Sequence, residues 1–113
     1  MSASDQAATP DKLVSDLLIE DPDMRDLVEE FVSGLVDRLA EFRQAHEQLN
    51  WDNLAKLAHQ LKGAGGSYGY SDHSKLGAEM ESASQTQSGD QFATWMKQFE
   101  DVTAAARKGL QDA

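Results

Sequence analysis

The chain of 113 residues contains no cysteine. This absence excludes a disulfide framework, a thiolate metal site and a thiol nucleophile, and it fits a reducing compartment. No apolar run approaches the roughly 20 residues of a membrane span, and the start MSASDQAATP lacks the basic residues and the apolar core of a signal peptide. We therefore expect a cytoplasmic protein that does not enter a membrane.

Basic side chains are scarce as well. Ten lysines and arginines stand against 20 acidic residues, which gives a formal net charge of -10. Binding to nucleic acid or to an anionic lipid surface would have to overcome general electrostatic repulsion. The charge balance therefore argues against nucleic acid and membranes as partners.

The chain also lacks any long stretch with the two-residue alternation of a β-strand, whereas helical spacing recurs. Residues 1–9 are small and polar and predict a flexible N-terminal tail. The remaining residues, 10–113, have the length of a single domain. A short helix of two or three turns is expected after Pro10. Its apolar residues would be Leu13, Val14, Leu17 and Leu18.

Four longer amphipathic segments follow, and each begins or ends with a recognisable signal. Asp21 is a favourable N-cap and Pro22 a favourable first residue for the first long helix. Asn50 and Ser71 are suitable N-caps for the second and third. The polar stretch QTQSGD at 85–90 predicts the turn before the last helix. Short connections place consecutive helices side by side.

Apolar residues recur in these segments at spacings of three and four, so each helix has one face for a common core. The predicted fold is all-α, an antiparallel four-helix bundle with an additional short N-terminal helix. The expected core residues are Met24, Leu27, Val28, Phe31, Leu35, Leu39, Phe42, Leu49, Leu54, Leu57, Ala58, Leu61, Tyr68, Leu76, Met80, Ala83, Phe92, Trp95, Met96, Phe99, Thr103, Ala106 and Leu110.

The histidine in AHQLKGAGGSYGY, His59, lies on the second long helix. Each residue turns a helix by about 100°, so His59 lies roughly 140° from Leu54, outside the buried arc. We therefore expect the imidazole to be exposed. Lys62 and Gly63 follow one turn later and border the same surface.

The glycines after His59 are costly in a helix, at about 1 kcal/mol each relative to alanine. The presence of glycine at positions 63, 65 and 66 therefore needs an explanation. Either a partner protein approaches the bare backbone closely, or the glycines let the next helix pack tightly. The same run leaves the end of the histidine helix open among Gly65, Gly66 and Gly69.

An exposed imidazole near an ammonium group suits transient bonding to a phosphoryl group. The neutral ring is nucleophilic, and histidine side chains ordinarily titrate near neutral pH. Lys62 can balance the charge of the resulting phosphoramidate. The bare helix face would let the active site of a second protein reach the ring nitrogen, because phosphoryl transfer depends on positioning.

The same stretch resembles the signature of histidine-containing phosphotransfer (HPt) domains. In that signature the phosphorylated histidine is followed by any residue, then Leu, Lys and Gly, with a further glycine six residues on. The matching positions here are His59, Leu61, Lys62, Gly63 and Gly69. The segments NWDNLAKLAHQLKG and LGAEMES are similar to the histidine helix and the following helix of the family, and the likeness covers most of the chain.

The resemblance implies that His59 accepts a phosphoryl group from the aspartate of a response-regulator receiver domain and passes it to another receiver in a two-component phosphorelay. It implies that Lys62 steadies the phosphate, that Gly63 allows the receiver to approach and that Gly69 is a structural turn residue. It further implies a carrier without kinase activity, ATPase activity or a cofactor, with Mg²⁺ bound by the receiver. A hybrid sensor kinase is a second candidate partner, and we expect a monomer.

A bundle that binds a metal through histidine and carboxylate is one alternative. His46 and His59 lie 13 residues apart on different helices, and no pair of ligands has the short spacing of a metal motif. We expect His46 to pack at a helix end, where it complements the dipole, and His73 to be solvated.

Two further alternatives concern the glycine-rich face. LKGAGGSYG lacks the Gly-Lys-Ser/Thr ending of a nucleotide-binding P-loop, and no strand precedes it. A helical protein-interaction module could use the face for docking without phosphotransfer, although this does not explain the pairing of His59 with Lys62. Lys56 and Lys62 make the surface locally less negative, whereas Glu79 and Glu81 are expected on an ordinary solvated face.

Overall fold

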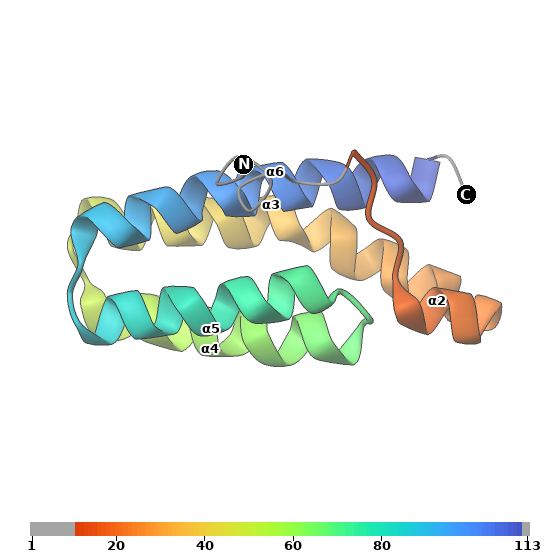
Figure 1. Cartoon of the computed structure of the whole chain (residues 1–113), viewed down its shortest axis with the longest axis horizontal. Coiled ribbons are helices and arrows are strands. Elements are labelled where there is room, and N and C mark those ends of the chain that lie inside the picture. The colour runs from red at the N-terminus through yellow and green to blue at the C-terminus, as the bar shows by residue number, and fades with distance from the viewer. Residues whose placement is uncertain (1–10, 112–113) are drawn as a thin grey trace, which may run out of the picture.

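The computed structural model describes residues 11–111, and the described part of the chain contains helices and no strand. Four long helices form an antiparallel bundle in which each helix packs against its two neighbours (Figure 1). They are α3 (Arg25–Glu47), α4 (Trp51–Ser67), α5 (Ser71–Gln85) and α6 (Gly89–Gln111). The predicted all-α bundle is confirmed. The tail predicted for residues 1–9 lies outside the described residues.

The additional N-terminal helix is present but shorter than predicted. It is α2 (Asp16–Glu20), a single turn whose N-cap is Ser15. The amide of Leu13 donates to the carbonyl of Ala105 in α6 at 3.0 Å. The backbone before α2 therefore bonds to the bundle and does not extend the helix towards the N-terminus.

The predicted start of the first long helix is confirmed with one refinement. Pro22 opens a short 3-10 helix, η1 (Pro22–Met24), which runs directly into α3. The side chain of Asp21 accepts a hydrogen bond from the amide of Asp23 at 3.2 Å. Asp21 is thus the N-cap of this combined element, and the missing N–H of proline costs nothing at its first position.

The N-cap prediction is correct for α4 and wrong for α5. The side chain of Asn50 accepts from the amide of Asn53 at 3.2 Å. At the next helix, Ser71 is the first helical residue, and the N-cap is Tyr70, which makes no side-chain cap bond. Tyr70 is buried, so packing of its ring in the core fixes this helix start.

The core lies between the four helices. Its largest fully buried side chains include Phe42, Phe92 and Phe99, and the rings of Phe42 and Phe99 meet edge to face at 5.5 Å. Burying such a ring stabilises the fold by roughly 1.5–3 kcal/mol. Two expected core residues are instead exposed: Leu27 at 46% and Leu49 at 62%. Leu49 has a φ of 53° in the turn between α3 and α4, where it cannot continue the α3 stripe.

Close backbone contact sets the register between α4 and α5. A Cβ atom added to Gly77 would lie 2.8 Å from the carbonyl oxygen of Ala58 and 2.5 Å from the amide of Lys62. One added to Gly65 would lie 2.7 Å from the amide of Ser74. Tight helix packing is therefore the reason for glycine at position 65, one of the two explanations that the sequence left open.

None of the helices within residues 11–111 has an apolar stretch of the length that crossing a bilayer requires.

Candidate functional site

His59 lies on the outer face of α4, as predicted, and 71% of its side chain is exposed. Lys62 and Gly63, one turn further on, are also exposed. A Cβ atom added to Gly63 would meet no other atom within 4 Å. Helix packing therefore does not explain this glycine, in contrast to Gly65.

Glu81 on α5 is a close charged neighbour of the His59 imidazole. The ring atom Nδ1 lies 3.2 Å from Oε2 of Glu81, whose side chain is only 22% exposed. The expectation that Glu81 lies on an ordinary solvated face is therefore wrong. The glycine contact at Gly77 fixes the register of α5, and Glu81 follows one turn later on the same helix, beside His59.

This contact determines which ring nitrogen is available for chemistry. A neutral imidazole carries one proton, and the second nitrogen keeps its lone pair. A carboxylate beside Nδ1 favours the tautomer with the proton on that atom. The lone pair then lies on Nε2, at the ring edge away from Glu81. The pair thus presents a nucleophilic nitrogen on a largely exposed ring.

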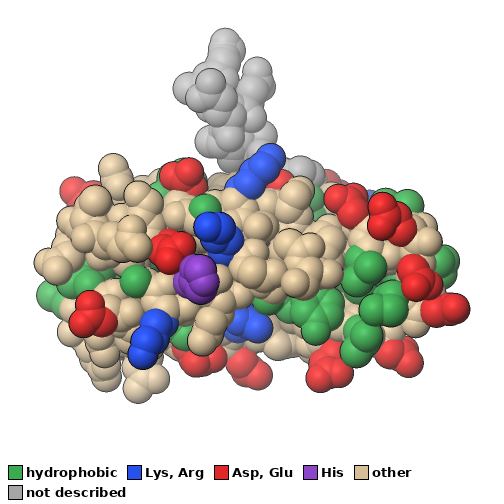
Figure 2. All heavy atoms as spheres, turned by 90° about the horizontal axis from the view of Figure 1, so that it is seen from below, with side chains coloured by type: hydrophobic (Ala, Val, Ile, Leu, Met, Phe, Trp, Pro, Cys, Tyr) green, Lys and Arg blue, Asp and Glu red, His purple; other side chains and the backbone are tan. Residues whose placement is uncertain are grey.

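The surface that bears the histidine is mixed in charge and apolar at one end. Figure 2 shows basic and acidic side chains bordering the histidine, and hydrophobic side chains gathered towards the α2 end of this face. Lys56 and Lys62 are both exposed on α4. They supply the less negative surroundings that the sequence predicted for this helix.

Leu27, Phe31 and Tyr68 form what we term the apolar end patch. Together with Gly34 and the charged residues Glu30 and Arg38, they line a groove of about 220 Å³ between α3 and the end of α4. The ring of Tyr68 stacks on that of Phe31 with centroids 4.8 Å apart. Tyr68 is the C-cap of α4 and follows His59 by nine residues, which is roughly 13 Å along the helix axis and half a turn around it.

Comparison with known families identifies this arrangement. The family model of the Hpt domain matches residues 26–109. The chain belongs to the Hpt domain family. Members of this family are phosphoryl carriers of two-component signalling that interact with receiver domains and kinases, and they are not themselves kinases or ATPases. Comparison with curated proteins and with solved structures gave no significant match.

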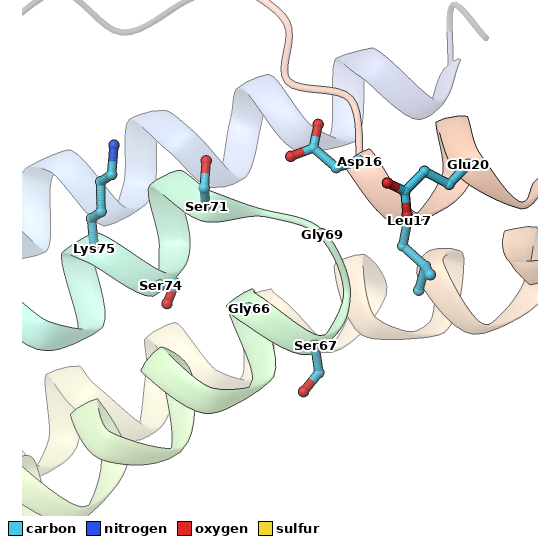
Figure 3. Close-up of a pocket in the computed structure, with 9 residues that line it drawn as sticks. All are labelled: Asp16, Leu17, Glu20, Gly66, Ser67, Gly69, Ser71, Ser74 and Lys75. Atoms are coloured by element: carbon cyan, nitrogen blue, oxygen red, sulfur yellow. The ribbon is translucent and has the colours of Figure 1, made fainter.

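A second groove of this Hpt domain, of about 400 Å³, lies between α2 and the α4–α5 turn (Figure 3). Its lining residues are Asp16, Leu17, Glu20, Gly66, Ser67, Gly69, Ser71, Ser74 and Lys75. The close-up shows that Ser71 and Lys75 point to one side and Ser67 to the other. These polar groups do not converge on one point, so the groove offers no built site for a small ligand.

His46 packs at the end of α3, as predicted. Its ring lies 5.0 Å from that of Phe92 and 6.2 Å from that of Trp51, measured between centroids. It stands in the last turn of α3, where a histidine complements the helix dipole.

His73 contradicts the expectation of a solvated side chain. It is fully buried on α5, and burial lowers its pKa to about 4. Its Nε2 lies 3.4 Å from the hydroxyl oxygen of Thr103. The residue shares the buried stripe of Leu76 and Met80, three and seven positions further on. The spacing of the sequence already contained this signal.

The metal alternative has no ligand set in residues 11–111, where no group of three or more histidine and carboxylate side chains could hold an ion. His46 packs against aromatic rings, His73 is buried, and His59 pairs with a single carboxylate.

Proposed function

We propose that this Hpt domain accepts a phosphoryl group on Nε2 of His59 from the phospho-aspartate of a receiver domain and passes it to the aspartate of a second receiver. The observation that supports the proposal is the His59 side chain itself, 71% exposed on a helix, with Nδ1 beside Glu81. A hybrid sensor kinase whose receiver holds the phospho-aspartate could serve as the donor.

In the accepting step the lone pair of Nε2 attacks phosphorus, and the bond between phosphorus and the aspartate oxygen breaks. The aspartate leaves as a carboxylate, and no proton has to move. The ring keeps its proton on Nδ1 and acquires a positive charge, which the carboxylate of Glu81 offsets at 3.2 Å. Donation to the second receiver reverses these bond changes.

Two neighbours of His59 assist the proposed transfer. Lys62 carries an ammonium group that can balance the charge of the phosphoryl oxygens. Gly63 leaves the helix surface bare, with space for at least a methyl group before any other atom of the domain is met. The receiver can therefore approach the backbone closely. It supplies the Mg²⁺ that the transfer uses, and the Hpt domain needs no cofactor of its own.

The apolar end patch belongs to the docking surface in this proposal. A protein interface of standard size covers about 800 Å² on each partner, the area of a disc with a radius of about 16 Å. Figure 2 shows hydrophobic side chains on the face that bears the histidine, gathered towards the α2 end. A receiver that covers His59 and extends towards the α2 end would contact the patch, and apolar side chains contribute most to the core of such interfaces.

Transfer of label tests the proposal. A candidate receiver carrying radiolabelled phosphate is mixed with the Hpt domain, and label should move to it in an acid-labile, alkali-stable form. His59→Gln should lose the label and keep its helicity, because the side chain is exposed. His46→Gln is the control and should retain labelling. Binding of the receiver without transfer to the unsubstituted protein would favour the interaction module; retained labelling of His59→Gln would overturn the assignment.

A further inference from the structure

A short N-terminal segment, residues 13–18, holds the end of the histidine-bearing helix. We term it the N-terminal clamp; it precedes the matched range of residues 26–109. The chain crosses from α6 towards α2 at the end of the bundle where α4 turns into α5 (Figure 1). Leu13 donates to the carbonyl of Ala105 at 3.0 Å, and Asp16 donates to the carbonyl of Gly69 at 2.9 Å. The clamp thus bonds to α6 and to the α4–α5 turn.

Ser15 is the central residue of the clamp. Its side chain is fully buried, although serine is a polar residue that usually lies at the surface. The hydroxyl donates to the carbonyl of Tyr68 and accepts from the amide of Leu18. One hydroxyl therefore caps α2 and satisfies a carbonyl at the end of α4.

Gly69 brings the turn against the clamp. Its φ is +82°, a conformation that favours glycine, and this agrees with the structural turn role that the family resemblance implied. An added Cβ atom would lie 2.6 Å from the hydroxyl oxygen of Ser15 and 2.8 Å from the amide of Asp16. The turn and the clamp are therefore in backbone contact that no other residue type permits.

The end of α4 needs such support. Gly63, Gly65 and Gly66 lie in its last turns, where glycine lowers helix stability. The carbonyls of Ala64, Gly65 and Gly66 accept from amides of the α4–α5 turn, so the helix end depends on how that turn is held. The clamp supplies donors to the carbonyls of Tyr68 and Gly69, immediately beyond the helix end.

We propose that the N-terminal clamp, through Ser15, is a positioning element that keeps the glycine-rich end of α4 helical. The bare face beside His59 is then already ordered when a partner docks. It touches no reacting atom. The consequence for docking rests on the proposed function, whereas the ordering of α4 does not.

Ser15→Ala tests the ordering. It leaves the carbonyl of Tyr68 without its donor, and amide exchange across 64–70 should accelerate about tenfold while overall helicity is kept. Ser84→Ala is the matched control, because it removes another buried serine hydroxyl, one that bonds within α5 to the carbonyl of Met80. The control should leave exchange at 64–70 unchanged. Equal exchange in both variants would overturn the proposal.

The docking consequence has its own readouts. In single-turnover transfer from the phosphorylated receiver, Ser15→Ala should raise the half-saturating concentration (KM) several-fold and leave the rate at saturation (kcat) unchanged. Labelling of His59 by phosphoramidate, a small donor that needs no docking, should proceed at the normal rate. An unchanged KM contradicts the docking role. If no receiver transfers to the unsubstituted protein, the proposed function fails, and the exchange data still decide whether the clamp orders α4.

A measurement on the unsubstituted protein covers the case in which Ser15→Ala does not fold. The amide of Asp16 bonds to Gly69, and that of Tyr70 bonds to Gly65 at 2.8 Å. If the clamp and the end of α4 open as one unit, both amides should exchange with the same dependence on low denaturant. If the two amides open independently, the clamp does not hold the end of α4, and the proposal is refuted.

Discussion

Nδ1 of His59 lies 3.2 Å from Oε2 of Glu81 across the α4–α5 contact. The carboxylate is mostly buried and the ring mostly exposed, so the glutamate can orient the imidazole without covering it. The nitrogen that keeps its lone pair is then Nε2. This pair connects the helix packing of the Hpt domain to the chemistry proposed for it.

Replacing Glu81 should slow phosphoryl acceptance without unfolding the domain. Glu81→Gln keeps the size of the side chain beside Nδ1 but removes the negative charge that offsets the phosphorylated ring. A partly exposed ion pair contributes about 1 kcal/mol, which corresponds to about fivefold in rate. Glu81→Ala also removes the polar side chain beside the ring and should be slower still. Glu79→Gln, an exposed residue on the same helix, is the control for initial transfer rates. Normal rates in both Glu81 variants would show that the contact is irrelevant.

Gly63→Gln should separate docking from folding. No atom lies within 4 Å of an added Cβ, and glutamine is a better helix former than glycine by about 0.5–1 kcal/mol. Urea unfolding should therefore show equal or higher stability, while transfer from the receiver slows because the side chain obstructs its approach. Gly65→Ala, two positions away, should instead destabilise the domain, because its Cβ would lie 2.7 Å from a backbone amide. Transfer at the unmodified rate by Gly63→Gln would rule out the bare face as a docking feature.

The apolar end patch offers a test within one helix. Leu27 and Val36 both lie on α3 with similar exposure, 46% and 48%, but nine residues place them on opposite sides of the helix. Leu27→Gln should weaken receiver binding about fivefold to tenfold, as expected for an apolar contact near an interface core. Val36→Gln should not change it. Titration calorimetry with the receiver compares the two; equal affinities would remove the patch from the interface.

Buried His73 should make stability depend on pH. Its pKa falls from 6.5 to about 4 on burial, so the folded state excludes a proton that the unfolded state binds below pH 6.5. The stabilisation is complete above pH 6.5 and is lost as the pH drops towards 4, by about 3 kcal/mol in total. Urea unfolding between pH 7 and 4 should show this loss, and His73→Leu should lack that component. Parallel pH curves for the two proteins would contradict it.

The sequence predicted the bundle and the exposure of His59 because both depend on local helical periodicity. Leu54, Ala58 and Leu61 define a buried arc, and the histidine falls outside it whatever the other helices do. The burial of His73 is equally readable from its spacing to Leu76, whereas its place in the first turn of the helix suggests a solvated side chain.

Other features depend on contacts between distant parts of the chain. Glu81 meets His59 only because the backbone contact at Gly77 fixes the register of two helices, and periodicity does not determine register. Leu13 was expected in a helix, and its amide bonds to Ala105 in α6 instead. The α5 cap was assigned to Ser71 from side-chain chemistry, whereas burial of Tyr70 decides that helix start.

The most direct test of the account is the position of the phosphate on the ring. The domain, with ¹⁵N in its imidazoles, is phosphorylated by a receiver, and nitrogen–proton correlation spectra identify the modified atom. We predict a single phosphohistidine at His59, bonded through Nε2 and protonated on Nδ1. Phosphate on Nδ1 of His59, or on any other residue, would contradict the account.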